Sequence, residues 1–278
     1  MPARPWASAA CPSALPSRSK RSSRSHDMTA PAWLTARPIA HRGYHDAAAG
    51  RIENTLPAVQ AAIDKRFAIE VDLQMTRDGE VVVFHDDTVD RLLVGTGRVE
   101  DLSLAELTAL PFRAAPDSVP TLGELLECVA GAAPLVIELK SDFSGNRRLE
   151  RAVAPILATY SGPFVVMSFD PESMIEMRSL APSIPRGIVA DRYLDLNDWG
   201  FLSRERRFRL RHLMDVPAAG ACFVSFDIGG LPSFHTSKFR ATQGPLITWT
   251  IRTPDQREKA RICADQITFE GFDPDADS

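Results

Sequence analysis

The sequence lacks the features that mark several large classes of protein. No apolar run approaches the ~20 residues that a membrane-spanning helix needs. The four cysteines contain no CxxC pair, which argues against a zinc ribbon and against a disulfide framework. Scattered thiols are typical of core residues in a reducing compartment, so we expect a cytoplasmic protein. The cysteines are Cys11, Cys128, Cys222 and Cys263.

An excess of basic residues is also missing. The chain has 32 basic and 36 acidic residues, a formal net charge of −4, which disfavours a nucleic-acid partner. What is present is an ordinary globular composition, because 44% of the 278 residues are hydrophobic and 24% are charged. A chain of this size can bury a sizeable core in one large domain or in two ordinary ones.

The beginning of the chain differs in composition from the rest. It is rich in Ser, Pro and Ala, and its basic residues face a single acid, Asp27. It lacks the apolar core of a secretory signal, and either a transit peptide or translation from Met28 fits it. We expect residues 1–36 to be a disordered basic tail and residues 37–278 to form the folded domain. The basic residues before Asp27 are Arg4, Arg18, Lys20, Arg21 and Arg24.

From residue 37 onward, short apolar runs alternate with amphipathic stretches such as Thr55–Lys65. Continuous apolar runs are typical of parallel strands that helices cover. Eight such strands in about 250 residues predict an α/β fold of the (β/α)8 barrel type, with a doubly wound open sheet as the alternative. The predicted strands are Pro38–Gly43, Ala68–Met75, Leu135–Lys140, Phe164–Phe169, Pro185–Ala190, Cys222–Ile228, Leu246–Ile251 and Gln266–Gly271.

Two features interrupt this alternation. A long segment, Thr76–Ala133, separates the second and third predicted barrel strands, and it contains a short strand at Glu80–Phe84 and a helix near Thr121–Ala130. An insertion at the catalytic face of a barrel usually serves the active site. At the other end only seven residues follow Gly271, so we expect the last helix to be short or missing.

Charged residues lie inside two of the apolar strands. Glu70 and Asp72 are two residues apart and therefore point to one side of their strand, and Glu138 and Lys140 repeat this spacing. Two like charges inside a barrel are costly unless a cation neutralises them. Three carboxylates suit a hard divalent ion, Mg²⁺ or Ca²⁺, better than zinc, although an ordinary ion-pair cluster is the alternative.

Two histidines follow strands in comparable places. His41 ends the first predicted strand and precedes Arg42, and His85 follows the short inserted strand. One such histidine could be merely structural, but imidazole can accept or donate a proton near neutral pH. Together with the fixed positive charges of Arg42 and Lys140, these groups could hold a phosphodiester and move its protons.

These residues resemble the glycerophosphodiester phosphodiesterase family, in order and spacing, from about residue 37 to residue 271. The resemblance implies a barrel with an insertion after the second strand, and metal-dependent hydrolysis of glycerophosphodiesters to glycerol 3-phosphate and an alcohol such as choline or ethanolamine. The motifs that carry it are His41-Arg42-Gly43, Glu53-Asn54-Thr55, Glu70-Val71-Asp72, His85-Asp86, Glu138-Leu139-Lys140, Ser168-Phe169-Asp170-Pro171 and Thr248-Trp249-Thr250.

The same resemblance implies a role for each site residue. It leaves open which histidine is the acid, which is the base, and whether a cyclic phosphate forms. By similarity, the cation would be ligated by Glu70, Asp72 and Glu138, and the general acid and base would be His41 and His85. The phosphate would be contacted by Arg42 and Lys140. Glu53 and Asn54 would line or support the glycerol end, and Trp249 would form an apolar wall.

The chain departs from the family pattern near its C-terminal end. Arg252 stands where the family often has Asn, and Glu270-Gly271 replaces the usual end of the eighth strand. We expect both changes to lie away from the metal and histidine motifs and to affect headgroup choice. Arg252 is expected to be a solvated charge, and His45 is assigned no role.

Two other functions share these residues. The same site could hydrolyse intact phospholipids, with the basic stretch Arg204–Arg211 attracting a lipid surface, or the barrel could bind phosphorylated ligands without cleaving them. In each case the expected partner is a small molecule rather than nucleic acid, without stable insertion into a membrane. The oligomeric state does not follow from the sequence.

Overall fold

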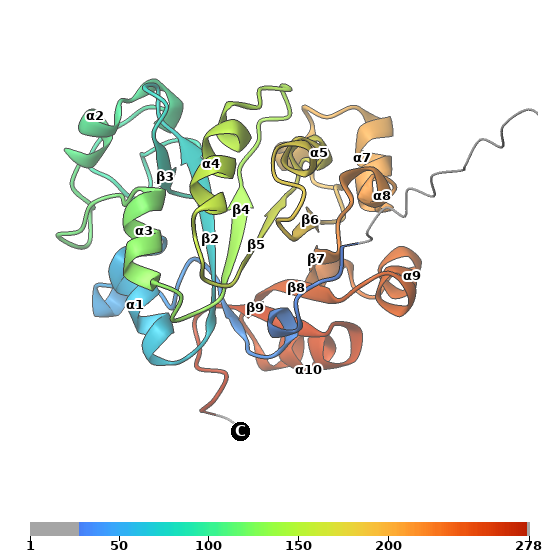
Figure 1. Cartoon of the computed structure of the whole chain (residues 1–278). Coiled ribbons are helices and arrows are strands. Elements are labelled where there is room, and N and C mark those ends of the chain that lie inside the picture. The colour runs from blue at the N-terminus through green and yellow to red at the C-terminus, as the bar shows by residue number, and fades with distance from the viewer. Residues whose placement is uncertain (1–27, 277–278) are drawn as a thin grey trace, which may run out of the picture.

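Eight parallel strands close into a barrel in the computed structural model, which describes residues 28–276 (Figure 1). Each strand pairs with the next along the chain, and β1 pairs with both β2 and β9. This closure confirms the predicted barrel and excludes the open sheet. The strands are β1 (Ile39–Ala40), β2 (Ala68–Met75), β4 (Leu135–Leu139), β5 (Phe164–Ser168), β6 (Arg186–Ala190), β7 (Phe223–Asp227), β8 (Leu246–Ile251) and β9 (Gln266–Phe269).

Helices cover the outside of the barrel (Figure 1). Several begin at side chains that accept hydrogen bonds from the first helical turn, such as Thr121 before α3 and Thr253 before α10. The helices are α1 (Leu56–Asp64), α2 (Leu104–Thr108), α3 (Leu122–Val129), α4 (Arg148–Ala158), α5 (Pro171–Leu180), α6 (Leu196–Trp199), α7 (Arg204–Arg211), α8 (Val216–Ala219), α9 (Phe234–Thr242) and α10 (Pro254–Cys263). No helix follows β9 within the described residues 270–276, as expected.

Alternate residues of each strand face different surroundings. In β2, Ile69, Val71 and Leu73 belong to the large core, together with residues of the outer helices. Ala68 instead belongs to a second core with Val136, Val165 and Ile247, which fills the amino-terminal half of the barrel interior. Glu70 and Asp72 share the side of Ala68, so the polar positions of β2 point inward above this apolar plug.

The insertion after β2 forms a lobe beside the barrel (Figure 1). Its strand β3 (Val81–Val83) pairs antiparallel with the carboxyl end of β2. The lobe has an apolar core of its own, in which Val82, Phe84 and Leu107 are buried. This packing holds the residue after Phe84, His85, at the carboxyl-terminal end of the barrel.

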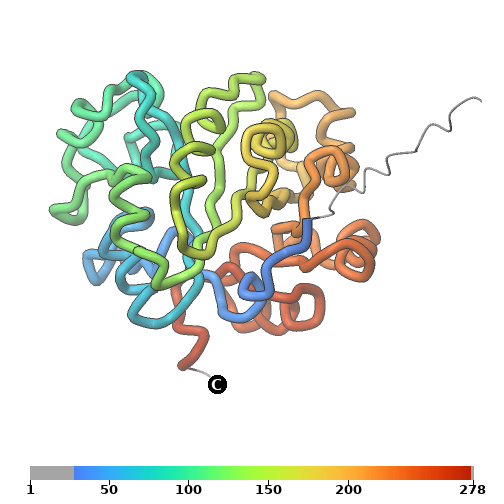
Figure 2. The backbone as a smooth tube through the Cα atoms, viewed as in Figure 1, coloured from blue at the N-terminus to red at the C-terminus, as the bar shows by residue number. Residues whose placement is uncertain are grey.

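Part of the predicted tail packs on the barrel. Ala32–Thr35 forms a 3-10 helix whose Leu34 is fully buried in the inner apolar core. Figure 2 shows this blue segment beside the red C-terminal strand, where the Gln266 side chain donates a hydrogen bond to the Thr35 carbonyl at 2.9 Å. Residues 28–36 are therefore part of the folded structure, and residues 1–27 lie outside the described residues.

The cysteines that the structure describes are unpaired. Cys222 is buried, and Cys128 and Cys263 are half-buried, while Cys11 lies outside the described residues. Within residues 28–276, none of the helices has the length and apolar character needed to cross a bilayer.

Candidate active site

Three carboxylates meet inside the barrel at the carboxyl ends of β2 and β4. Asp72 and Glu138 are paired in register across the two strands, and Glu70 lies two residues before Asp72. One oxygen from each of the three carboxylates can be chosen so that all lie within 4.8 Å of one another, and all three side chains are buried. The structure thus brings together the three carboxylates that the sequence analysis proposed as metal ligands.

The electrostatics of this cluster indicate more negative charge than Lys140 and Arg42 balance. Burial, followed by the charges of Asp72 and Glu138, raises the pKa of Glu70 well above its usual range. Burial also raises the pKa of Glu138. Burial opposes ionisation of Asp72 too, but the charges of Lys140, His85 and Arg42 and the hydrogen bond from Lys140 together outweigh it and lower the pKa of that carboxyl. A set of buried oxygen donors with unbalanced negative charge fits a hard divalent cation.

Lys140 and Asn54 hold the carboxylates in place. The Lys140 ammonium lies 2.7 Å from both Asp72 and Glu138, and these two acids raise its pKa although burial alone would lower it. The Asn54 amide donates to Asp72 Oδ2 at 2.9 Å and accepts from the Asp72 backbone N–H at 3.2 Å. Asn54 therefore orients a metal-ligand candidate.

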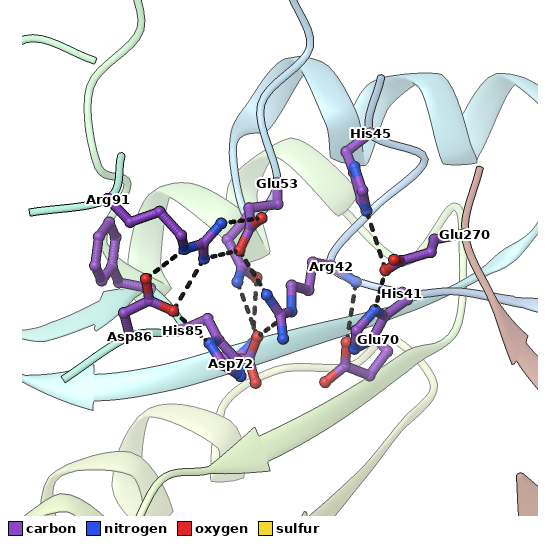
Figure 3. Close-up of polar contacts among 12 residues, drawn as sticks. His41, Arg42, His45, Glu53, Glu70, Asp72, His85, Asp86, Arg91 and Glu270 are labelled. Carbon is purple, nitrogen blue, oxygen red and sulfur yellow. Dashed lines mark hydrogen bonds and ion pairs between the residues drawn. The ribbon is translucent and has the colours of Figure 1, made fainter. Parts of the chain in front are cut away.

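Arg42 projects from a tight turn after β1. Its backbone N–H donates to Glu70 Oε2 at 2.9 Å, and its guanidinium donates to Glu53 Oε1 at 2.6 Å (Figure 3). The next residue, Gly43, has φ of +81°, and a Cβ there would lie 2.9 Å from the backbone and Cβ of Ala58. Only glycine fits this close approach to α1, so the turn that aims Arg42 needs Gly43.

His41 and Glu270 form a pair across β1 and β9. Glu270 Oε2 lies 2.6 Å from His41 Nδ1 (Figure 3). Burial lowers the pKa of His41 to about 4, against the opposing effect of the Glu270 hydrogen bond. Burial would raise the pKa of Glu270, but the hydrogen bonds from His41 and His45 keep it below its usual range.

The prediction about the C-terminal departures was therefore wrong in one respect. Glu270 does not lie away from the histidine motifs, since it contacts His41 directly and His45 at 3.6 Å. Arg252 is half-exposed but paired, with its Nε 2.5 Å from Glu270 Oε1. The end of β9 and the residue after β8 thus belong to the site.

His85 has a carboxylate partner of its own. Its Nδ1 lies 2.7 Å from Asp86 Oδ1, and Arg91 binds the same carboxylate through Nε at 2.6 Å (Figure 3). Arg91 also donates to both oxygens of Glu53. One guanidinium therefore ties the insertion that carries His85 to the loop that supports Arg42.

A cavity of about 510 Å³ opens in front of these groups. His41, His85 and Trp249 line it, and the Trp249 ring packs edge-on against Phe169 at 5.5 Å between centroids. Glu53 and Asn54 do not line this cavity, so they support Arg42 and Asp72 from behind rather than facing a ligand. The predicted pocket wall at Trp249 is present.

Sequence reasoning assigned no role to several residues that complete the site. Arg91 and His45 stood in no recognised motif, and Glu270 was visible only as a departure from the family pattern. Asp86 did stand in a motif, directly after His85, and that adjacency was the usable signal. All of them act on other side chains of the site, so strand pattern alone does not reveal them.

The fold and this set of groups define a barrel enzyme of the phosphoric diester hydrolase class. The chain belongs to the glycerophosphoryl diester phosphodiesterase family, whose model matches residues 41–267.

Individual relatives are similar over part of their length. A glycerophosphodiester phosphodiesterase of Bacillus subtilis is 34% identical over 170 residues, which are 53% of this chain and 57% of that protein. Human glycerophosphodiester phosphodiesterase 1 is 36% identical over 152 residues, 50% of this chain and 44% of that protein. The chain thus matches about half the length of these two relatives.

Solved structures share the fold at lower identity. A phosphodiesterase of Oleispira antarctica, in complex with the product sn-glycerol-3-phosphate, superposes with a TM-score of 0.70 at 22% identity, covering 85% of this chain and 94% of that one. A glycerophosphoryl diester phosphodiesterase structure from Silicibacter pomeroyi gives 0.69 at 24% identity, covering 84% and 89%. These likenesses support the barrel architecture.

Proposed function

We propose that this chain hydrolyses glycerophosphodiesters to glycerol 3-phosphate and an alcohol. The observation that carries the proposal is that one cavity is lined by three buried carboxylates, two histidines and two fixed cations. Each histidine is also tied through Nδ1 to a carboxylate, which leaves its Nε2 available for proton transfer. These are the groups that cleavage of a phosphodiester requires.

Glu70, Asp72 and Glu138 would hold Mg²⁺ or Ca²⁺, which in such sites neutralises charge developing on phosphoryl oxygens. Arg42 and Lys140 would contact the same phosphate, Arg42 through its planar fork and Lys140 as a point charge. Both are anchored by acids of the site, Arg42 by Glu53 and Lys140 by Asp72, so they are already oriented before a substrate arrives.

His41 is the better general base of the two. Because burial keeps its pKa near 4, its imidazole is neutral at pH 7 and can accept a proton. Glu270 at Nδ1 orients the ring and stabilises the imidazolium that forms. The attacking oxygen, from water or from a glycerol hydroxyl, gives its proton to His41 as the new P–O bond forms.

His85 then serves as the general acid. Asp86 at Nδ1 orients the ring, and Nε2 donates to the leaving oxygen as the P–O bond to the alcohol breaks. Protonation matters because simple alkoxides are poor leaving groups. With water as the nucleophile, one water adds across the ester in this step, and one proton enters at His41 while one leaves from His85. With a glycerol hydroxyl as the nucleophile, the same proton transfers give a cyclic phosphate, and one water then opens the ring to glycerol phosphate.

The test is an assay of the purified full chain on glycerophosphocholine and glycerophosphoethanolamine, following glycerol 3-phosphate. We expect release with Mg²⁺ or Ca²⁺ and loss of release with EDTA. The variants Glu70→Gln and His85→Asn should lose at least about 100-fold in kcat with unchanged circular dichroism. Full activity in both variants would exclude this site, and no release by the wild type with either ion would exclude the substrate class.

A further inference from the structure

The active-site cavity has a second arm. A recess of about 670 Å³ begins at His85, Glu138 and Lys140, which also line the first arm, and extends away from His41. Asp198 and Trp199 line both arms, so α6 and the residues around it form the wall at which the arms meet. A phosphodiester likewise has two ester groups attached to one phosphorus atom.

Aromatic rings form one wall of the second arm. The rings of Trp199, Phe143 and Phe201 contact one another in a triangle, with the Trp199 centroid 6.3 Å from each phenyl centroid and the two phenyl centroids 5.8 Å apart. Phe169 continues this wall into the first arm, 5.3 Å from Trp199. Phe201 is 63% exposed although it is a large apolar residue. Ring faces of this kind attract a cation.

The second arm also carries two carboxylates that form no close ion pair, although the charge of Arg98 acts on Asp142 at longer range. Among the described residues, no Lys, Arg or His nitrogen lies within 4.0 Å of the carboxylates of Asp142 or Asp198. The arm's own arginine, Arg98, is engaged with Glu100 at 2.6 Å and with Asp87 at 4.0 Å. The arm therefore offers net negative charge beside aromatic faces.

The first arm shares Asp198 and also contains Asp191, but it differs from the second arm in holding more positive charge. Its two arginines away from the carboxylate cluster are both paired, Arg192 with Asp227 at 3.4 Å and Arg252 with Glu270 at 2.5 Å. It also contains His41, the base of the proposed mechanism. The attacking side of the reaction thus belongs to the first arm, and the second arm begins at the acid His85, where the alcohol leaves.

We propose that the second arm binds the departing alcohol and selects one that carries an ammonium group, such as choline or ethanolamine. This inference rests on the proposed function and adds to it the recognition of the headgroup. Phe143, Trp199 and Phe201 supply ring faces for the cation, and Asp142 and Asp198 supply the opposite charge.

The test compares two substrates that differ only in charge. They are glycerophosphocholine and the corresponding ester of 3,3-dimethylbutanol, in which carbon replaces the ammonium nitrogen. We expect kcat/KM to favour the choline ester by about tenfold or more. Hydrolysis of both at equal rates would overturn the headgroup inference while leaving the proposed function intact. Release of glycerol 3-phosphate from neither would overturn the proposed function itself.

Variants of second-arm residues test whether this arm causes the preference for the charged headgroup. Asp198→Asn and Phe201→Leu should each lower kcat/KM for the choline ester about three- to tenfold and leave the neutral ester unchanged. Both side chains are exposed, so neither change is expected to unfold the protein. Asp195→Asn is the matched control, because it removes the same charge three residues away and outside both arms. An equal loss on both esters, or a rise on the neutral one alone, would contradict the assignment.

Discussion

At the scale of single residues, each of the two histidines depends on a carboxylate that orients its ring. Glu270 holds His41 and Asp86 holds His85, each at Nδ1 and each at a distance below 3 Å. A carboxylate in this position fixes the tautomer of the ring and its orientation. His41, Arg42 and His85 could be predicted because they stand in compact motifs. Glu270 could not, because it lies 229 residues from the histidine that it contacts.

Glu270→Gln is expected to lower kcat about 10- to 100-fold with little change in KM, since Glu270 is a positioning residue for His41. Glu258→Gln is the control, because that glutamate lies on α10 and pairs with Arg261 at the surface. Steady-state kinetics on both variants measure the difference, and an equal fall in the control would argue against a specific role.

The pH profile gives a second readout for the same variant. His41 must be neutral to act as a base, so activity should persist below pH 6.5 and fall only as the pH approaches about 4. The negative charge of Glu270 favours protonated His41, so its removal should move this acid limb to still lower pH. If the acid limb of the pH profile lay at the same pH in the variant, Glu270 would have no effect on the titration of His41.

At the scale of elements, the insertion between β2 and β4 is a separate piece of structure that must be fixed to the barrel. It has its own apolar core and delivers His85. Its length and inserted strand were predicted from the sequence, but its attachment was not. Arg91 makes that attachment, because it binds Asp86 beside His85 and Glu53 behind Arg42. Such a contact joins loops that are distant in sequence, and no periodic pattern encodes it.

Arg91→Lys is therefore expected to lower kcat about tenfold while changing the melting temperature little. Lysine keeps the charge but cannot bind both carboxylates with a rigid fork. Arg113→Lys, on the exposed side of the same insertion, is the matched control and should retain activity. Assays at saturating substrate together with thermal melts measure both effects, and full activity of the Arg91→Lys variant would show that the clamp is dispensable.

At the scale of the whole molecule, the barrel has an apolar end and a polar end. The inner apolar core is closed by Leu34 from the segment before β1, and the carboxylate cluster lies beyond it at the carboxyl ends of the strands. The sequence-based boundary at residue 37 placed Leu34 in the predicted disordered tail, because the first predicted strand begins only at Pro38. The open end of the barrel provides the burial that orders this segment.

Leu34→Ala is expected to reduce the free energy of unfolding by about 3 kcal/mol, since it leaves a cavity at a fully buried position. Leu194→Ala, at a residue that is 58% exposed, should change it by less than about 0.5 kcal/mol. Urea titrations of the two variants measure this difference. Equal free energies of unfolding for the two variants would mean that Leu34 is not part of the cooperatively folding core.

The order of amino acids along the chain was enough to predict the barrel, its insertion and the residues that carry charge into the strands. This was possible because apolar periodicity and compact motifs are local, and their spacing along the chain decides which strand bears which group. The partners of the histidines and of Arg42 became known from the folded molecule alone: Glu270 on His41, Asp86 on His85 and Arg91 across two loops. The contacts of Glu270 and Arg91 depend on strand register and barrel closure, which join residues through space rather than along the chain.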